Sequence, residues 1–150
     1  MDSRVRPAYP GHHFFLPYLI NRVTIFMNIG FQKVLDNHGL TLTQWRVLAF
    51  LAEQDGLSVN ALADATITEQ STLSRALASL EGSGYVRREP NPEDSRSVKT
   101  FLAPKGKKVF DLVLARALDL EALILRDIPP EETEVLRQLL QRIMVNLQPG

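Results

Sequence analysis

The fold of this chain is decided by the stretch Ser58–Leu102, which reads SVNALADATITEQSTLSRALASLEGSGYVRREPNPEDSRSVKTFL. Its first half contains two amphipathic segments separated by a few polar residues. Its second half contains two runs typical of β-strands around a segment rich in proline and charge. Two short helices joined by a tight turn and followed directly by a β-hairpin form a winged helix-turn-helix. We therefore predict that fold here.

The helix boundaries follow from capping residues. Ser58 is expected to cap a short helix over Val59–Ala65. The next helix is expected to begin at Thr66 or Thr68 and to end at Glu81, just before a glycine-rich segment. The turn between the two helices is therefore only a few residues long.

A leucine stripe decides which face of the second helix is buried. Leu73, Leu77 and Leu80 recur at helical spacing and should face the core. Short polar side chains and a guanidinium remain on the opposite face, where they suit base edges and phosphates in a DNA major groove. The alternative is an ordinary solvated face without function. The candidate DNA-binding residues of this helix are Gln70, Ser71, Thr72, Ser74 and Arg75.

The β-hairpin is the candidate wing. Its strands are expected over Tyr85–Glu89 and Ser97–Leu102, joined by a long loop, Pro90–Arg96. An arginine at such a tip suits insertion into a minor groove, and Asp94 would orient the guanidinium of Arg96. From the spacing alone, a surface ion pair without function is the stronger interpretation. The candidate DNA-binding residues of the wing are Arg87, Asp94, Arg96 and Lys99.

Long helices are expected before and after the predicted winged helix-turn-helix, which we call the head. The first, over about His13–Asn37, is apolar on nearly every face, which predicts burial on two sides. Thr41 and Gln44 have capping-box spacing at the start of the following helix. Two more helices are expected over Lys105–Arg126 and from Pro129 onward, and the last has a narrow apolar stripe. In so small a chain, a second subunit is the natural cover for the surplus apolar faces.

Charge is distributed unevenly although the net charge is zero. Residues 66–108 carry eight basic and five acidic side chains, whereas residues 109–150 carry four and seven. The positive segment coincides with the predicted head, as expected for a surface that meets nucleic acid.

Composition argues against other classes of protein. The chain has no cysteine, which excludes a disulfide framework, zinc–thiolate sites and a cysteine redox sensor. The apolar run Phe14–Ile20 contains Pro17 and is far shorter than the ~20 residues of a membrane span. With no signal peptide evident, we expect a cytoplasmic protein with no membrane partner. No phosphate-binding glycine loop or histidine pair at metal spacing is present, so we expect no enzyme, cofactor or metal.

The sequence resembles the MarR (multiple antibiotic resistance regulator) family of transcriptional regulators over roughly residues 14–147. The resemblance is carried by five motifs in this order: Gly39–Leu48 (GLTLTQWRVL), Ala61–Ala63, Ser71–Arg75 (STLSR) with Leu80–Glu81 and Gly84–Val86, Asp94–Ser97 (DSRS), and Leu102–Gly106 (LAPKG). It implies that Asp94 and Arg96 act on DNA, which reverses the interpretation from spacing. It also implies a homodimer that represses a pseudopalindromic operator.

The resemblance divides the chain into two parts. Residues 39–103 would form the winged helix-turn-helix DNA-binding lobe, and residues 1–38 and 104–150 the helical dimerisation region, in a mainly α fold with a small β-hairpin. The sequence departs from the family at Gln70, where arginine or lysine is common, and at Ala76, Ala78 and Ser79, which leave the helix unusually uncharged. These departures put base preference and affinity in doubt.

A small aromatic or anionic effector is a further expectation. Phe14, Tyr18, Trp45 and Arg46 would supply aromatic walls and a cation to a cleft between the dimer helices and the DNA lobe. An ordinary core role for Trp45 and Phe14 explains them equally well. The remaining alternative for the whole chain is a winged-helix module that binds protein instead of DNA.

Overall fold

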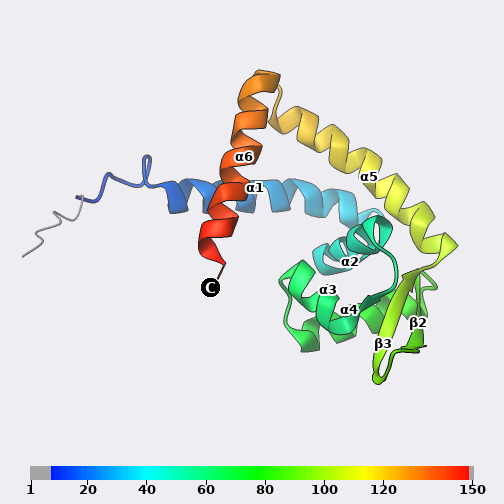
Figure 1. Cartoon of the computed structure of the whole chain (residues 1–150). Helices are drawn as coiled ribbons and strands as arrows, with labels where there is room; N and C mark the ends of the chain where they lie inside the picture. Colours follow the sequence, from blue (N-terminus) through cyan, green and yellow to red (C-terminus); the bar gives the residue numbers. More distant parts are fainter. Residues whose placement is uncertain (1–7, 149–150) are drawn as a thin grey trace, which may run out of the picture.

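A computed structural model of the chain describes residues 8–148. It confirms a mainly α fold with a small antiparallel sheet. In Figure 1, a compact lobe formed by α2–α4 and the sheet lies at one end, and the long helices α1 and α5 extend away from it toward α6. The elements are α1 (Leu16–Asp36), α2 (Leu42–Glu53), β1 (Leu57–Ser58), α3 (Val59–Thr66), α4 (Gln70–Gly82), β2 (Val86–Asn91), β3 (Asp94–Leu102), α5 (Pro104–Ile124) and α6 (Pro130–Leu147).

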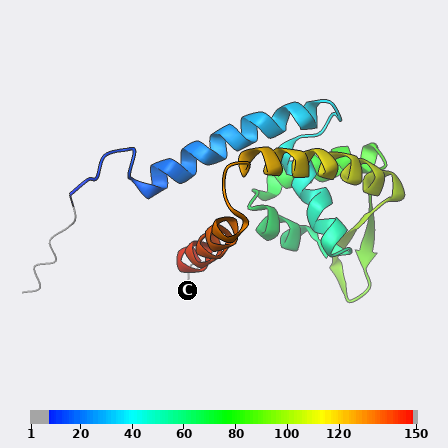
Figure 2. The same ribbon diagram turned by 90° about the horizontal axis from the view of Figure 1, so that it is seen from above.

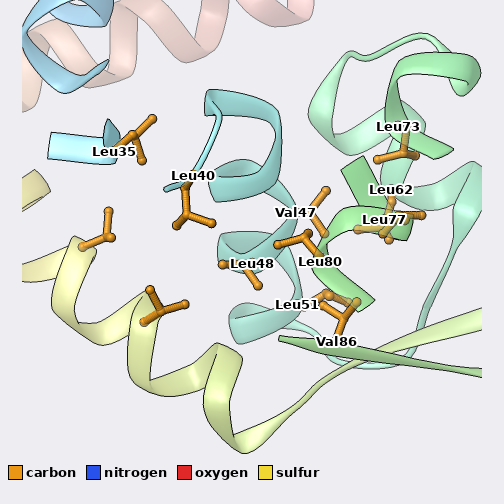
Figure 3. Close-up of a cluster of buried hydrophobic side chains, with 12 residues drawn as sticks. Leu35, Leu40, Val47, Leu48, Leu51, Leu62, Leu73, Leu77, Leu80 and Val86 are labelled. Carbon is orange, nitrogen blue, oxygen red and sulfur yellow. The ribbon is translucent and has the colours of Figure 1, made fainter. Parts of the chain in front are cut away.

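Helix α2 is the centre of the core. Its Val47, Leu48 and Leu51 are at most 2% exposed and lie between α5 on one side and α4 on the other (Figure 3). Each fully buried leucine or valine contributes about 1.5–3 kcal/mol to the free energy of folding. The same core takes in the end of α1 and the start of α5, so these helices are anchored in the lobe and not merely attached to it. The rest of this core is Leu35, Leu40, Leu62, Leu73, Leu77, Leu80, Val86, Val109 and Val113.

Of the three helix starts predicted from capping residues, those of α2 and α3 are confirmed and that of α4 is wrong. The Thr41 hydroxyl accepts from the Gln44 amide, and the Gln44 side chain accepts from the Thr41 amide, so the capping box is present. Ser58 caps α3 by accepting from the amide of Ala61. For α4, however, the N-cap is Glu69, whose side chain does not cap.

The two threonines before α4 are engaged elsewhere. The Thr66 hydroxyl donates to the carbonyl of Leu62 within α3, and the Thr68 hydroxyl donates to the carbonyl of Thr66. Both bonds are local side-chain-to-backbone contacts that compete with helix capping. The first turn of α4 therefore keeps backbone N–H groups that no side chain caps.

The sheet has three strands in the order β1-β3-β2, and β1 was not predicted. The predicted long tip of the hairpin is also wrong, because both strands extend into it and only Pro92 and Glu93 separate them. Pro90 pairs with Val98 while Asn91 pairs with Asp94, so residues 95–97 of β3 bulge outward near the tip.

Helices α1 and α6 expose large apolar side chains. Along α1, Leu16, Val23 and Phe26 are each more than half exposed, and on α6 Val135 and Met144 are as well. Figure 2, viewed from above, shows the second half of α1 beside α5, whereas most of α6 points away from both. Arg137 of α6 forms an ion pair with Glu121 near the end of α5, with Nη2 3.0 Å from Oε1. Across the described part of the chain, no helix combines the length and the apolar character needed to cross a membrane.

Candidate nucleic-acid interface

Helix α4 carries the predicted recognition surface. Leu73, Leu77 and Leu80 are at most 1% exposed, which confirms the buried stripe. The five candidate residues are all exposed. Ser71 and Arg75 lie opposite the leucines, whereas Gln70, expected on that face, lies three residues before Leu73 and contacts α3. One amphipathic helix therefore buries its leucines in the lobe and presents a polar surface outward, as a major-groove helix requires.

Gln70, at the start of this surface, is hydrogen-bonded to the preceding helix. Its Nε2 donates to Oδ1 of Asn60 at 2.8 Å. Asn60 lies in the first turn of α3 and is exposed. It was missed in the sequence because nothing in its spacing indicates that it would meet a side chain ten residues later.

Arg75 lies on the α2 side of the recognition surface. Together with Thr72 it lines a shallow groove whose other wall is formed by Thr41 and Thr43 at the start of α2. The buried side chain of Gln44 donates from Nε2 to Ser79 Oγ at 2.9 Å, which joins α2 to α4 beneath this groove. The position of the helix that carries Arg75 is thus fixed relative to α2 by packing and by a part-buried hydrogen bond.

The wing tip is ordered by side-chain contacts to its own backbone. Asp94 Oδ1 accepts from the backbone N–H of Arg96 at 3.0 Å. This corrects the expectation that Asp94 would orient the guanidinium, and the reason is local: an aspartate readily accepts from the amide two residues later in a tight turn. Asn91 accepts from the Glu93 amide and donates to Ser97 Oγ at 2.8 Å. Hydrogen bonds of Asn91 on β2 and of Asp94 on β3 therefore hold the bulge that carries Arg96.

Arg96 itself projects from this bulge. It is exposed, and no ion pair to its side chain occurs within residues 8–148. With Asn60 and Asp94 it borders a polar concavity of about 450 Å³ between α3 and the wing tip. This places an unpaired guanidinium on the rim of a concave surface that also includes the start of the helix-turn-helix.

The other wing cations are partly engaged. The guanidinium of Arg87 lies 4.6 Å from the ring centroid of Phe101 and pairs with Glu89. Lys99 Nζ lies 3.8 Å from Glu93 Oε2. Exposed ion pairs of this kind contribute only about 0–1 kcal/mol, so both cations can exchange their partners for phosphates at little cost.

Arg88 has a structural role at the base of the wing. Its guanidinium forms an ion pair with Glu81 at the end of α4, with Nε 2.8 Å from Oε2. The side-chain hydrogen bond from Arg88 lowers the pKa of the Glu81 carboxyl below its ordinary value. This pair connects the recognition helix to β2 and so couples the orientation of the wing to that of α4.

The predicted effector residues do not lie together in one protomer. A cavity of about 190 Å³ between α1, α2 and α5 includes Trp45, which stacks on Phe110 with ring centroids 5.1 Å apart. Phe14, Tyr18 and Arg46 do not line this cavity; the first two lie at the far end of α1 from the lobe, and Arg46 is exposed on α2. Sequence reasoning missed the rest of the lining: Met27, Asn28, Phe31, Ala117, Leu120, Glu121 and Ile124.

Over the described residues, no group of three or more histidine or acidic side chains could hold a metal ion. The candidate surface on α4 and the wing instead presents hydrogen-bonding groups and positive charge.

Comparisons with known proteins agree with this geometry. A sequence model of the MarR family matches residues 38–97. The transcriptional regulator HosA of Escherichia coli O111:H- is 30% identical over 105 residues, which are 70% of this chain and 78% of HosA. The crystal structure of a MarR-family transcriptional regulator from Silicibacter pomeroyi is 32% identical, with a TM-score of 0.86 over 97% of this chain and 98% of that one. The chain belongs to the MarR family of transcriptional regulators.

The MarR resemblance extends beyond the lobe. The HTH-type transcriptional regulator YybA of Bacillus subtilis is 31% identical over 121 residues, which are 81% of this chain and 78% of YybA. The match to the Silicibacter structure includes the long helices at both ends. This MarR-family protein is therefore a DNA-binding transcriptional regulator that carries the family's winged helix-turn-helix.

Proposed function

We propose that this protein is a homodimeric repressor that binds a pseudopalindromic DNA operator through α4 and the wing. The observation that carries the proposal is the position of α4, whose leucines anchor it in the core while Gln70, Ser71, Thr72, Ser74 and Arg75 remain exposed. Uncapped N–H groups in its first turn offer further donors to a phosphate.

On the wing, Arg96 is the proposed minor-groove residue. It is exposed, unpaired among the described side chains, and carried by a bulge that Asn91 and Asp94 fix. The loop is therefore already ordered in the free protein, so binding to DNA does not include the entropic cost of ordering it, which favours tight binding. Arg87 and Lys99 would add contacts to the backbone along the strands.

The proposed dimer rests on the exposed apolar helices. A monomeric protein rarely exposes as many large apolar side chains as α1 and α6 do here. A second copy would cover them and would place two recognition helices ~34 Å apart, one turn of B-DNA. In this proposal, residues 39–103 bind DNA and residues 1–38 and 104–150 hold the dimer.

A small aromatic effector is the finer part of the proposal. The cavity beside Trp45 touches α1, α2 and α5, so a ligand there would contact both the dimer helices and the DNA lobe. Its size fits a ligand with a single ring. Glu121 in its lining is paired with Arg137 of α6, with Nη2 3.0 Å from Oε1, and none of these lining residues is a cation, which favours an uncharged aromatic ligand over an aromatic acid.

Selection of bound duplexes from a random DNA pool tests the central proposal. The expected outcome is an inverted repeat whose half-sites lie one helical turn apart. A pool that shows no enrichment, together with binding to a protein partner through the same surface, would instead favour a protein-interaction module.

A further inference from the structure

The amide of Gln70 is held in one orientation by the helix before it. Gln70 is the first residue of α4, and its Nε2 donates to Asn60 Oδ1 at 2.8 Å. Both side chains are exposed, and Gln70 lies three residues before Leu73, at the end of the leucine stripe that is nearest to α3. The hydrogen bond thus connects the start of the recognition helix to α3 at the surface that would enter the groove.

This bond defines which groups Gln70 still offers. A glutamine amide has two N–H donors and one carbonyl acceptor. After one N–H is donated to Asn60, the second N–H and Oε1 remain free. Adenine presents an acceptor, N7, beside a donor, its N6 amino group, in the major groove. The remaining groups of Gln70 match that pair.

The same bond disfavours a turn of the Gln70 amide alone, because Oε1 would then lie against Asn60 Oδ1 and two acceptors would meet without a proton between them. The bond survives such a turn only if the amide of Asn60 turns as well and donates from Nδ2. Guanine presents two acceptors, N7 and O6, and favours donors from the protein. An amide that is free to turn therefore distinguishes adenine from guanine less well than one that is held.

We infer that Asn60 is a positioning residue that makes Gln70 specific for adenine. The inference rests on the proposed sequence-specific binding of DNA. Asn60 acts through Gln70 and need not touch the base. In the free protein this exposed hydrogen bond competes with water and adds little to stability, whereas exclusion of water from the interface strengthens it. Loss of Asn60 should therefore change base preference without changing folding.

The experiment is selection from a random DNA pool with the wild type and four variants. Gln70→Ala removes the side chain that would contact the base, and Asn60→Ala removes the acceptor of its hydrogen bond. Asn60→Asp keeps an acceptor at residue 60 but has no N–H group to donate. Gln32→Ala is the matched control, because it removes an exposed amide hydrogen bond to Asp36 on α1, away from the head. Thermal melting of each variant verifies that it is folded.

We expect the wild type to select adenine at one position in each half-site, and Gln70→Ala to lose that preference. Asn60→Ala should reduce the preference for adenine over guanine at the same position by about fivefold or more and leave the other positions unchanged. Asn60→Asp should keep the preference, although its added negative charge near the phosphates lowers the overall affinity. Gln32→Ala should match the wild type.

The inference is overturned if Asn60→Ala retains the wild-type preference at every position, or if Asn60→Asp loses it as Asn60→Ala does. It is also overturned if Asn60→Ala melts like the wild type yet binds no DNA, because a positioning role affects one base only. A wild type that enriches no sequence overturns this inference together with the proposed function.

Discussion

Ile67, in the turn between α3 and α4, adopts a left-handed conformation with φ 50° and ψ 51°. It is the single residue other than glycine with positive φ among residues 8–148, and its side chain is 92% exposed. This conformation costs a residue with a Cβ about 1–2 kcal/mol, and the exposed side chain recovers none of it by packing. We expect Ile67→Gly to raise the free energy of unfolding by up to about 1 kcal/mol, after the greater freedom of glycine in the unfolded chain is subtracted.

Urea unfolding measures this effect as a higher midpoint with an unchanged slope. The control is Ile67→Ala, which removes the same apolar surface but keeps the Cβ and its strain. Equal midpoints for the glycine and alanine variants would show that the backbone at this position is not strained.

Two buried threonines differ in whether their hydroxyls are paired. Thr100 in β3 is fully buried and its Oγ1 has no hydrogen-bond partner among residues 8–148, whereas Thr66 Oγ1 donates to the Leu62 carbonyl at 2.7 Å. A buried polar group without a partner costs about 1–3 kcal/mol. We expect Thr100→Val to stabilise the protein by about 1 kcal/mol and Thr66→Val to bring no such gain. Differential scanning calorimetry of the two variants is the measurement, and equal shifts in Tm would contradict the assignment.

At this scale the sequence predicts the exposed face of α4 well, because the spacing of Leu73, Leu77 and Leu80 alone decides which side chains point outward. Asn60 could not be predicted, since its contact with Gln70 depends on the angle between two helices. The partner of Asp94 was mistaken for a different reason. Its carboxylate accepts from the backbone amide two residues later, a local contact that takes the place of the expected one to the Arg96 guanidinium.

Among the elements, α5 and the residue that precedes β2, Tyr85, approach each other more closely than a side chain allows. A Cβ on Gly106 would lie 2.0 Å from the backbone oxygen of Tyr85. Helix propensity alone favours alanine over glycine by about 1 kcal/mol, so the two effects have opposite signs. We expect Gly106→Ala to destabilise the protein by about 2 kcal/mol, because α5 must move away from the lobe.

Gly82, at the end of α4, is the matched control, since no neighbouring atom of the described residues would lie within 4 Å of a Cβ at this position. Gly82→Ala should be neutral or slightly stabilising in the same urea titration. Should Gly106→Ala prove as stable as Gly82→Ala, the close contact between α5 and Tyr85 would not exist in solution.

Element boundaries show where sequence patterns stop being informative. The capping residues predicted the starts of α2 and α3 correctly, because the hydrogen bonds that these residues form are local. The hairpin was misjudged because Pro90, Asn91 and Asp94 are typical turn residues that here pair across two strands. Strand β1 was missed because two residues carry no periodicity, and it forms only where β3 supplies a partner.

For the whole molecule, the apolar stripe of α6 should hold the dimer. Leu136, Leu139 and Leu140 are each at least 39% exposed within one protomer. Leu139→Glu would place a charge in a buried seam, so we expect mainly monomer by sedimentation velocity and at least tenfold weaker operator binding. The apolar faces of the long helices predicted that a second subunit covers them. No sequence pattern within one chain, however, specifies the angle at which the helices of two copies cross.

The control is Gln138→Glu, which adds the same charge on the opposite face of α6. It should remain dimeric and bind DNA as the wild type does. If Leu139→Glu sediments as the wild type does, the stripe is not the dimer contact.

The central claim is that Arg75 on α4 and Arg96 on the wing contact DNA phosphates or bases together. The most direct test is equilibrium binding to the selected operator across a range of salt concentrations, with the wild type, Arg75→Ala, Arg96→Ala and, as the control, Arg116→Ala on α5. We predict that affinity falls steeply with salt, and that Arg75→Ala and Arg96→Ala each weaken binding and reduce the salt slope by about one for each lost phosphate contact. Arg116→Ala should leave both quantities unchanged. Affinity that is insensitive to salt, or equal affinities and slopes for all four proteins, would contradict the account.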